Sequence, residues 1–298
     1  MTAVAGVVLA GGRSSRMGRP KADLEWHGST LLRRVTGIVT RAVDGPVVVV
    51  RAPGQRLPAL APDVLVRDDP RDGMGPLQGL AVGLQIAAER SARAAFVCST
   101  DMPFLHPAFV RHVVAALRAG VDVVMPVVDG HPQPLAAVYR TALAADVARW
   151  LDAGERRLTA VAARCRTTVL RREDLLADRA VATVDPALAS LRNLNRPADY
   201  RAARAGVAPA VGVRLRGDPT IGERTLDVRA ATVAGAAERL GLSMDGVVVE
   251  INGVATRDGT MPLVDGDQLV ITDRAYRRAE PGRRSLTHPS GADEEAET

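Results

Sequence analysis

The chain has 298 residues, of which 47% are hydrophobic, 24% charged and 3% aromatic, and its formal net charge is +5. These values exclude disordered and fibrous chains, and the few aromatic residues available for base stacking favour a small phosphorylated ligand over nucleic acid. No apolar run approaches the roughly 20 residues of a membrane helix, and residues 1–4 lack a signal peptide's basic start, so we expect a cytoplasmic protein without membrane association.

Residues 1–206 alternate short valine-rich runs with amphipathic helical patterns, which predicts an α/β domain with a Rossmann-like, mostly parallel sheet. The strands are expected at residues 4–9, 46–50, 64–66, 94–98 and 121–128. The helices are expected at residues 30–43, 77–88, 107–119 and 141–151, with a last one beginning near Pro197. The strand runs are almost continuously apolar, as is typical of strands covered on both faces.

The pattern changes after residues 205–210, whose Ala, Gly and Pro content is typical of a linker. We expect a small α+β domain over residues 211–274, with strands at 211–216, 225–228, 246–252 and 268–272 and a helix at 232–240. Residues 275–298 are rich in Arg, Pro and Gly and end in an acidic run, so we expect a disordered tail. Because every candidate catalytic residue precedes the linker, residues 1–206 are expected to be active alone.

Three polar or glycine-rich segments directly follow predicted strands, at residues 10–21, 67–79 and 99–103. Ligands of open α/β sheets bind at the carboxyl ends of the strands, so these segments are expected to converge on one crevice.

The first of these segments combines two adjacent glycines, Gly11 and Gly12, with the cations Arg13, Arg16 and Lys21. Glycines let the backbone approach a phosphate closely, and successive N–H groups form an anion-binding concavity. The spacing is neither that of a P-loop nor that of a dinucleotide-binding turn. Lys21 is the only lysine among 39 basic residues, which indicates that this position requires a compact ammonium and not a planar guanidinium.

Residues 9–21, LAGGRSSRMGRPK, resemble the L-A-G-G-x-S-x-R-M-G-x-x-K signature of the molybdenum cofactor guanylyltransferases, which are Rossmann-like nucleotidyltransferases. Three further segments are similar to the family's motifs: residues 75–79 (GPLQG) to G-P-L-A-G, residues 99–103 (STDMP) to its D-x-P segment, and residues 193–195 (NLN) to its N-x-N. The resemblance spans residues 4 to about 200.

The resemblance implies transfer of GMP from GTP to molybdopterin that carries molybdenum, with release of pyrophosphate. Arg16, Lys21 and Asp101 would be catalytic, with Asp101 also holding Mg²⁺. The nucleotide would contact Leu9, Ala10, Gly11, Gly12, Arg13, Lys21, Asp68 or Asp69, Gly75 and Asp101.

Alternatives stay open at several positions. Asp101 could instead cap a turn, and Asn193 and Asn195 could either contact the substrate or satisfy backbone groups near the helix start. The family often has an asparagine after the second strand, where this chain has Arg51-Ala52-Pro53. The choice of GTP over CTP rests on analogy with the family. Two alternatives for the function are a related nucleotidyltransferase that uses another NTP or acceptor, and a non-catalytic nucleotide-binding scaffold.

Two features lie outside this resemblance. Residues 249–253 and 264–267 are similar to β-grasp sulphur-carrier proteins, but the chain continues where those carriers end in Gly-Gly. We therefore expect a module that docks molybdopterin-handling proteins, or else a structural appendage. Cys98 and Cys165 have no partner at metal-ligand spacing and are expected to be buried free thiols.

Overall fold

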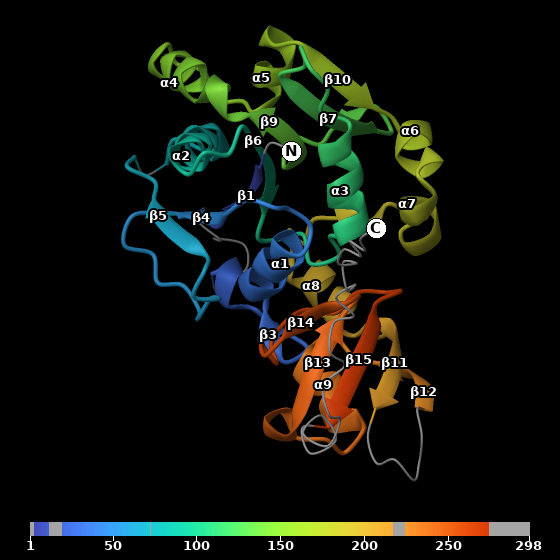
Figure 1. Ribbon diagram of the computed structural model, residues 1–298. Helices are drawn as coiled ribbons and strands as arrows, with labels where there is room; N and C mark the ends of the chain where they lie inside the picture. Colours follow the sequence, from blue (N-terminus) through green and yellow to red (C-terminus); the bar gives the residue numbers. More distant parts are fainter. Residues whose placement is uncertain (1–2, 12–19, 72, 217–223, 274–298) are drawn as a thin grey trace, which may run out of the picture.

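A computed structural model describes residues 3–11, 20–71, 73–216 and 224–273. Within these residues, eight strands form one sheet in the order β10-β7-β9-β6-β1-β4-β5, with β8 paired to β7 (Figure 1). The strands are β1 (Val4–Leu9), β4 (Val47–Arg51), β5 (Leu65–Asp68), β6 (Ala94–Ser99), β7 (Val123–Val128), β8 (His131–Pro132), β9 (Ala136–Arg140) and β10 (Thr167–Leu170). The pairs β1/β4, β1/β6, β4/β5 and β7/β10 are parallel, so the predicted mostly parallel sheet is confirmed.

Helices cover both faces of this sheet. They are α1 (Leu31–Thr40), α2 (Pro76–Glu89), α3 (Pro107–Ala115), α4 (Ala144–Asp152), α5 (Thr159–Arg164), α6 (Arg172–Ala177), α7 (Arg179–Val184) and α8 (Pro197–Arg204). Helices α1, α3, α6 and α7 bury side chains in one core cluster, and α2, α4 and α5 in another. Along β1, Val8 belongs to the first cluster and Val7 and Leu9 to the second, because successive side chains of a strand point to opposite faces.

The sequence pattern missed β9, which lies antiparallel between β6 and β7. Before it, a hairpin turn at Asp129 and Gly130 joins β7 to β8, and the φ angles of 52° and 76° are those of a tight turn favoured by Asp-Gly. That dipeptide signals the hairpin but not β9. Strand β10 and helices α5 to α7 were also not predicted, since their runs are too short to show a clear period.

Several predicted helices have different bounds in the structure. Thr30 is not helical but caps α1, because its side chain accepts a hydrogen bond from the N–H of Arg33. Helix α3 ends at Ala115, four residues before the predicted end, and the chain turns at Gly120 with a φ of 79°. The expected helix at 141–151 is a 3₁₀ turn, η2 (Thr141–Leu143), followed by α4.

The C-terminal part forms a separate five-stranded sheet in the order β12-β11-β15-β13-β14. Its elements are β11 (Ala210–Arg216), β12 (Arg224–Arg229), α9 (Val233–Arg239), η4 (Met244–Gly246), β13 (Val247–Ile251), β14 (Val254–Thr256) and β15 (Gln268–Asp273). Strand β14 was not predicted, but the other strands and the helix appear in the expected order. Val233 of α9 packs with Val213 and Val249 in a core of its own. The expected tail over residues 275–298 lies outside the described residues.

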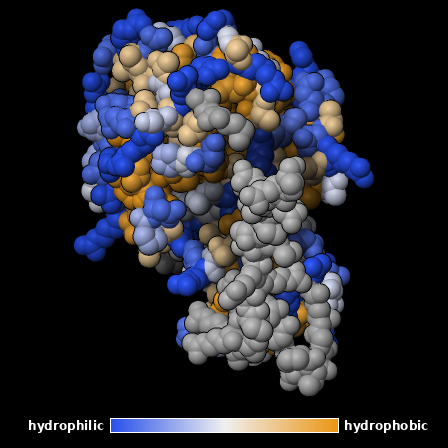
Figure 2. Space-filling model, in the orientation of Figure 1, coloured by the Kyte–Doolittle hydropathy of each residue, from blue (hydrophilic) through white to orange (hydrophobic). Residues whose placement is uncertain are grey.

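The surface of the larger part mixes hydrophilic residues with smaller hydrophobic patches on the face shown in Figure 2. Among the described residues, no helix is long and apolar enough to span a bilayer.

Candidate functional site

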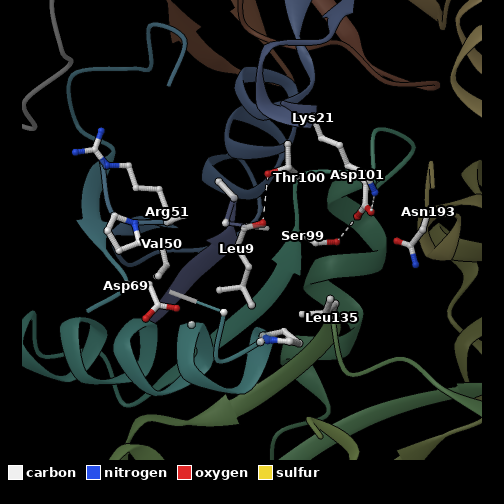
Figure 3. Close-up of a pocket in the computed structure, with 18 of the residues that line it drawn as sticks. Leu9, Lys21, Val50, Arg51, Asp69, Ser99, Thr100, Asp101, Leu135 and Asn193 are labelled. Carbon is white, nitrogen blue, oxygen red and sulfur yellow. Dashed lines mark hydrogen bonds and ion pairs between the residues drawn. The ribbon is translucent and has the colours of Figure 1, made fainter. Parts of the chain in front are cut away.

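The carboxyl ends of β1, β4 and β6 border a cavity of about 590 Å³ (Figure 3). Each of the three segments predicted to converge contributes to it. The lining residues are Leu9, Ala10, Gly11, Lys21, Val50, Arg51, Ala52, Pro53, Asp69, Gly73, Gly75, Pro76, Gly79, Ser99, Thr100, Asp101, Leu135, Asn193 and Asn195. The site therefore lies where ligands of open α/β sheets bind.

Lys21 and Asp101 form an ion pair at one side of the cavity, where Figure 3 shows their side chains pointing toward each other. Lys21 Nζ lies 2.6 Å from Asp101 Oδ2, and the side chains are 22% and 13% exposed. Ser99 donates its hydroxyl to Oδ1 of the same carboxylate. Lys21 is the first residue of η1 (Lys21–Asp23), which follows Pro20, and Asp101 follows β6. The pair brings together residues 80 positions apart.

The loop with Asn193 and Asn195 is held against this pair by Leu194. Its N–H donates to the carbonyl of Asp101 at 2.9 Å, and its side chain is fully buried. Lys21 Nζ then donates to Asn195 Oδ1 at 3.0 Å. Asn193 also lines the cavity.

The beginning of the glycine-rich loop is fixed by backbone contacts to β4. The N–H groups of Ala10 and Gly11 donate to the carbonyl of Val50 at 2.8 and 3.3 Å. A Cβ at Gly11 would lie 3.1 Å from the backbone nitrogen of Ala52, so this close approach favours glycine.

Leu9, Ala10 and Gly11 all line the cavity, as expected for nucleotide contacts. Gly12, Arg13 and Arg16, predicted to complete the phosphate loop, lie outside the described residues.

Asp69 lies on the opposite side of the cavity (Figure 3), and Gly75 also lines the cavity. Asp68 does not line the cavity but pairs with Arg51, whose Nε lies 2.5 Å from its carboxylate. Of the two aspartates offered by the sequence, Asp69 is therefore the one placed at the site. Gly75 has a φ of 79° and precedes α2, where Pro76 occupies the first turn.

Sequence reasoning did not assign a role to Gln55. Its Nε2 donates to the carbonyl of Ala10, and its Oε1 accepts from the N–H of Ala52, both at 3.1 Å. It thus joins the start of the phosphate loop to the loop after β4. Leu135 was missed because it precedes β9, the strand that the pattern did not predict.

Both cysteines are free thiols, as predicted, although Cys165 is only partly buried. Burial and the nearby Asp101 raise the pKa of Cys98 above its usual range, so this thiol stays protonated next to the site. It is therefore unsuited to act as a nucleophile or metal ligand.

A mostly parallel sheet with an ion pair, a glycine-rich loop and two asparagines at its carboxyl edge defines an α/β protein built to handle a phosphorylated ligand. The chain belongs to the MobA-like NTP transferase domain family, which matches residues 6–169. This match leaves the five-stranded sheet outside the family domain.

Two relatives are named "probable molybdenum cofactor guanylyltransferase". The one from Mycobacterium avium is 41% identical over 202 residues, which are 67% of this chain and 94% of the relative. The one from Mycobacterium marinum is 48% identical over 162 residues, which are 53% of this chain and 79% of the relative. The fold is similar to the crystal structure of molybdopterin-guanine dinucleotide biosynthesis protein A from Archaeoglobus fulgidus, with a TM-score of 0.53 and 24% sequence identity. The similarity covers 67% of this chain and 97% of that structure.

Proposed function

We propose that the chain transfers GMP from GTP to molybdopterin that carries molybdenum, forming the guanine dinucleotide form of the cofactor and releasing pyrophosphate. The names of the two relatives support the reaction. In this chain, the main support for the proposal is the Lys21–Asp101 pair, which lines the same cavity as the start of the glycine-rich loop.

The chemistry requires alignment and charge neutralisation and no general base, because the attacking pterin phosphate is ionised at neutral pH. One of its oxygens bonds to the α-phosphorus of GTP, while the bond to the bridging oxygen breaks and its electron pair leaves with pyrophosphate. Lys21 and Arg16 are proposed to stabilise the departing charge. The exposed fraction of Lys21, 22%, leaves its ammonium accessible from the cavity.

The donor chemistry of the site fits Mg²⁺. This ion is usually held by one or two carboxylates, with substrate phosphates and waters as further ligands. Asp101 would supply the carboxylate. Its place in the cavity lining supports this role, and the Lys21 ammonium contacts both this carboxylate and the amide oxygen of Asn195. When bound, the ion would neutralise charge on the triphosphate.

The nucleotide is proposed to extend across the cavity, with its triphosphate near Lys21 and its base or ribose near Asp69. Leu9, Val50, Leu135 and Pro76 supply the apolar surface on which a flat base could lie. Asn193 and Asn195 are proposed to face the pterin substrate.

For the C-terminal part we propose a β-grasp fold of the sulphur-carrier type. Its support is a small mixed sheet, with β11 and β15 parallel, and a helix packed into its core. Sulphur transfer is not proposed, because residues 274–298, which follow β15 in the sequence, contain no Gly-Gly pair. Docking of a molybdopterin-handling protein is the proposed role.

The test is to incubate the full chain with each NTP and with molybdenum-loaded molybdopterin or several sugar phosphates, and to measure pyrophosphate and the dinucleotide product. Turnover that requires GTP and the pterin is the expected result. Turnover with another NTP or acceptor would establish a related nucleotidyltransferase instead, and GTP binding without any turnover would establish a scaffold.

A further inference from the structure

One face of α1 is the docking surface for the C-terminal part of the chain. Arg33, Arg34, Gly37 and Arg41, spaced as residues of one helix face, all contact the segment 258–267. At Gly37 an added Cβ would lie 2.5 Å from Cδ of Pro262, so only glycine permits this close approach. Helix α1 therefore lies between the larger sheet and the C-terminal part (Figure 1).

Arg33 and Arg41 bind carboxylates of the C-terminal part. Arg33 donates to Asp258 and, at 2.9 Å, to the hydroxyl of Thr260. Arg41 donates to both carboxylate oxygens of Asp267, and Asp267 is only 2% exposed. These two arginines attach the C-terminal part to α1, and neither lines the cavity.

Arg34 differs from its neighbours because it binds backbone carbonyls on both sides of the interface. Its Nε donates to the carbonyl of Pro103 at 2.5 Å, and its Nη1 to the carbonyl of Leu263 at 3.3 Å. The residue is 5% exposed. Burial, with a smaller contribution from Arg41, lowers its pKa to about 10, so the guanidinium stays charged at neutral pH.

Pro103 ends the STDMP segment, two residues after Asp101. The segment is held at one point by Leu194, which donates to the carbonyl of Asp101, and at another by Arg34, which donates to the carbonyl of Pro103. Met102 between these points is 2% exposed. Within the larger part, Thr100 also donates to the carbonyl of Leu9 on the other side of Asp101. The contact from Arg34 is the one that is shared with the C-terminal part.

We infer that Arg34 is a positioning residue through which the C-terminal part holds the Asp101 segment in place for catalysis. The inference rests on the proposed GMP transfer. It assigns the C-terminal part a role inside the catalytic unit, and it argues against the sequence-based expectation that residues 1–206 are active alone.

The test compares the same substitution at two adjacent residues of α1 in the full chain. Arg34→Gln places an amide nitrogen where Nε was, so it keeps a donor for Pro103 but loses the one for Leu263. Arg34→Met loses both. Arg33→Gln is the matched control, because it weakens attachment to the C-terminal part without touching the Asp101 segment.

Small displacements of reacting groups can lower rates by up to about a hundredfold, so we expect kcat to fall about fivefold in Arg34→Gln and about twentyfold in Arg34→Met. Arg33→Gln should keep kcat within about twofold of wild type, and KM for GTP should change by no more than about twofold in all three, since the glycine-rich loop is unaltered. Melting temperatures establish that each variant is folded under assay conditions.

Wild-type kcat in folded Arg34→Gln, or an equal loss in Arg33→Gln, would overturn the inference. The first result would mean that the link to Leu263 does not position the segment, and the second that attachment alone matters. If Arg34→Met does not fold, the comparison of Arg34→Gln with Arg33→Gln still tests whether Arg34 positions the Asp101 segment. Absence of GMP transfer by the wild-type chain would contradict the proposed function itself.

Discussion

Replacement of Asp101 by asparagine separates the charge of this side chain from its shape. The carboxylate accepts hydrogen bonds from the Ser99 hydroxyl and the Lys21 ammonium. An asparagine can keep its oxygen toward Lys21 and turn its amide nitrogen toward Ser99, whose hydroxyl can also accept. The ion pair becomes a hydrogen bond from the Lys21 ammonium to a neutral amide oxygen, and the bond with Ser99 becomes neutral, so the free energy of unfolding should fall by only about 1 kcal/mol.

Turnover should fall far more than stability. The substitution removes the negative charge proposed to hold Mg²⁺ at the triphosphate, and the loss of such a group costs on the order of a hundredfold in kcat, or about 2.7 kcal/mol in the activation free energy. Affinity for GTP without metal should change little. Asp69→Asn on the opposite side of the cavity is the matched control, and it should raise KM for GTP more than it lowers kcat.

The assay measures pyrophosphate release, metal-free GTP affinity and melting temperature in one preparation of each variant. Wild-type kcat in Asp101→Asn would refute the role as metal ligand. Joint loss of turnover, GTP affinity and melting temperature would instead show that Asp101 is a turn-capping residue.

Three further predictions concern Lys21, Gly37 and His106. Lys21→Ala should lower kcat at least tenfold. Lys21→Arg should recover only part of the lost kcat, because a wider guanidinium does not fit beside Asp101. Full activity of the arginine variant in the same assay would contradict this. Gly37→Ala should lower the melting temperature by several degrees, because its Cβ meets Pro262, and an unchanged melting curve would contradict the close contact. Burial lowers the pKa of His106 below 6.5 and outweighs the opposite effect of Asp265, Asp267 and Asp185, which raise it. As the pH falls, this histidine is therefore protonated in the unfolded chain before it is protonated in the folded chain, so stability should fall as pH drops below 6.5. His106→Asn should flatten that part of the stability curve in denaturant titrations, and an unchanged curve would contradict this role of His106.

The sequence by itself determined the parts of this protein that depend on local order. Buried valine-rich runs identified the strands, and the glycine-rich segment and Asp101 each follow such a run directly. Because the carboxyl ends of parallel strands lie at one edge of a sheet, that order was enough to predict that Lys21 and Asp101 share a crevice. Their separation of 80 residues did not matter to the argument.

The tertiary structure alone decided what depends on contacts between distant segments. Strand β9 is antiparallel and short, and nothing in its own sequence states which strands it lies between. The choice of Asp69 over Asp68 follows from the pairing of Asp68 with Arg51 across two strands. Arg34 appeared only as one of many arginines, and its role emerged because the fold brings Pro103 and Leu263 to opposite sides of one buried guanidinium. Periodicity reports which face of an element is buried, but it does not specify the partner that covers that face.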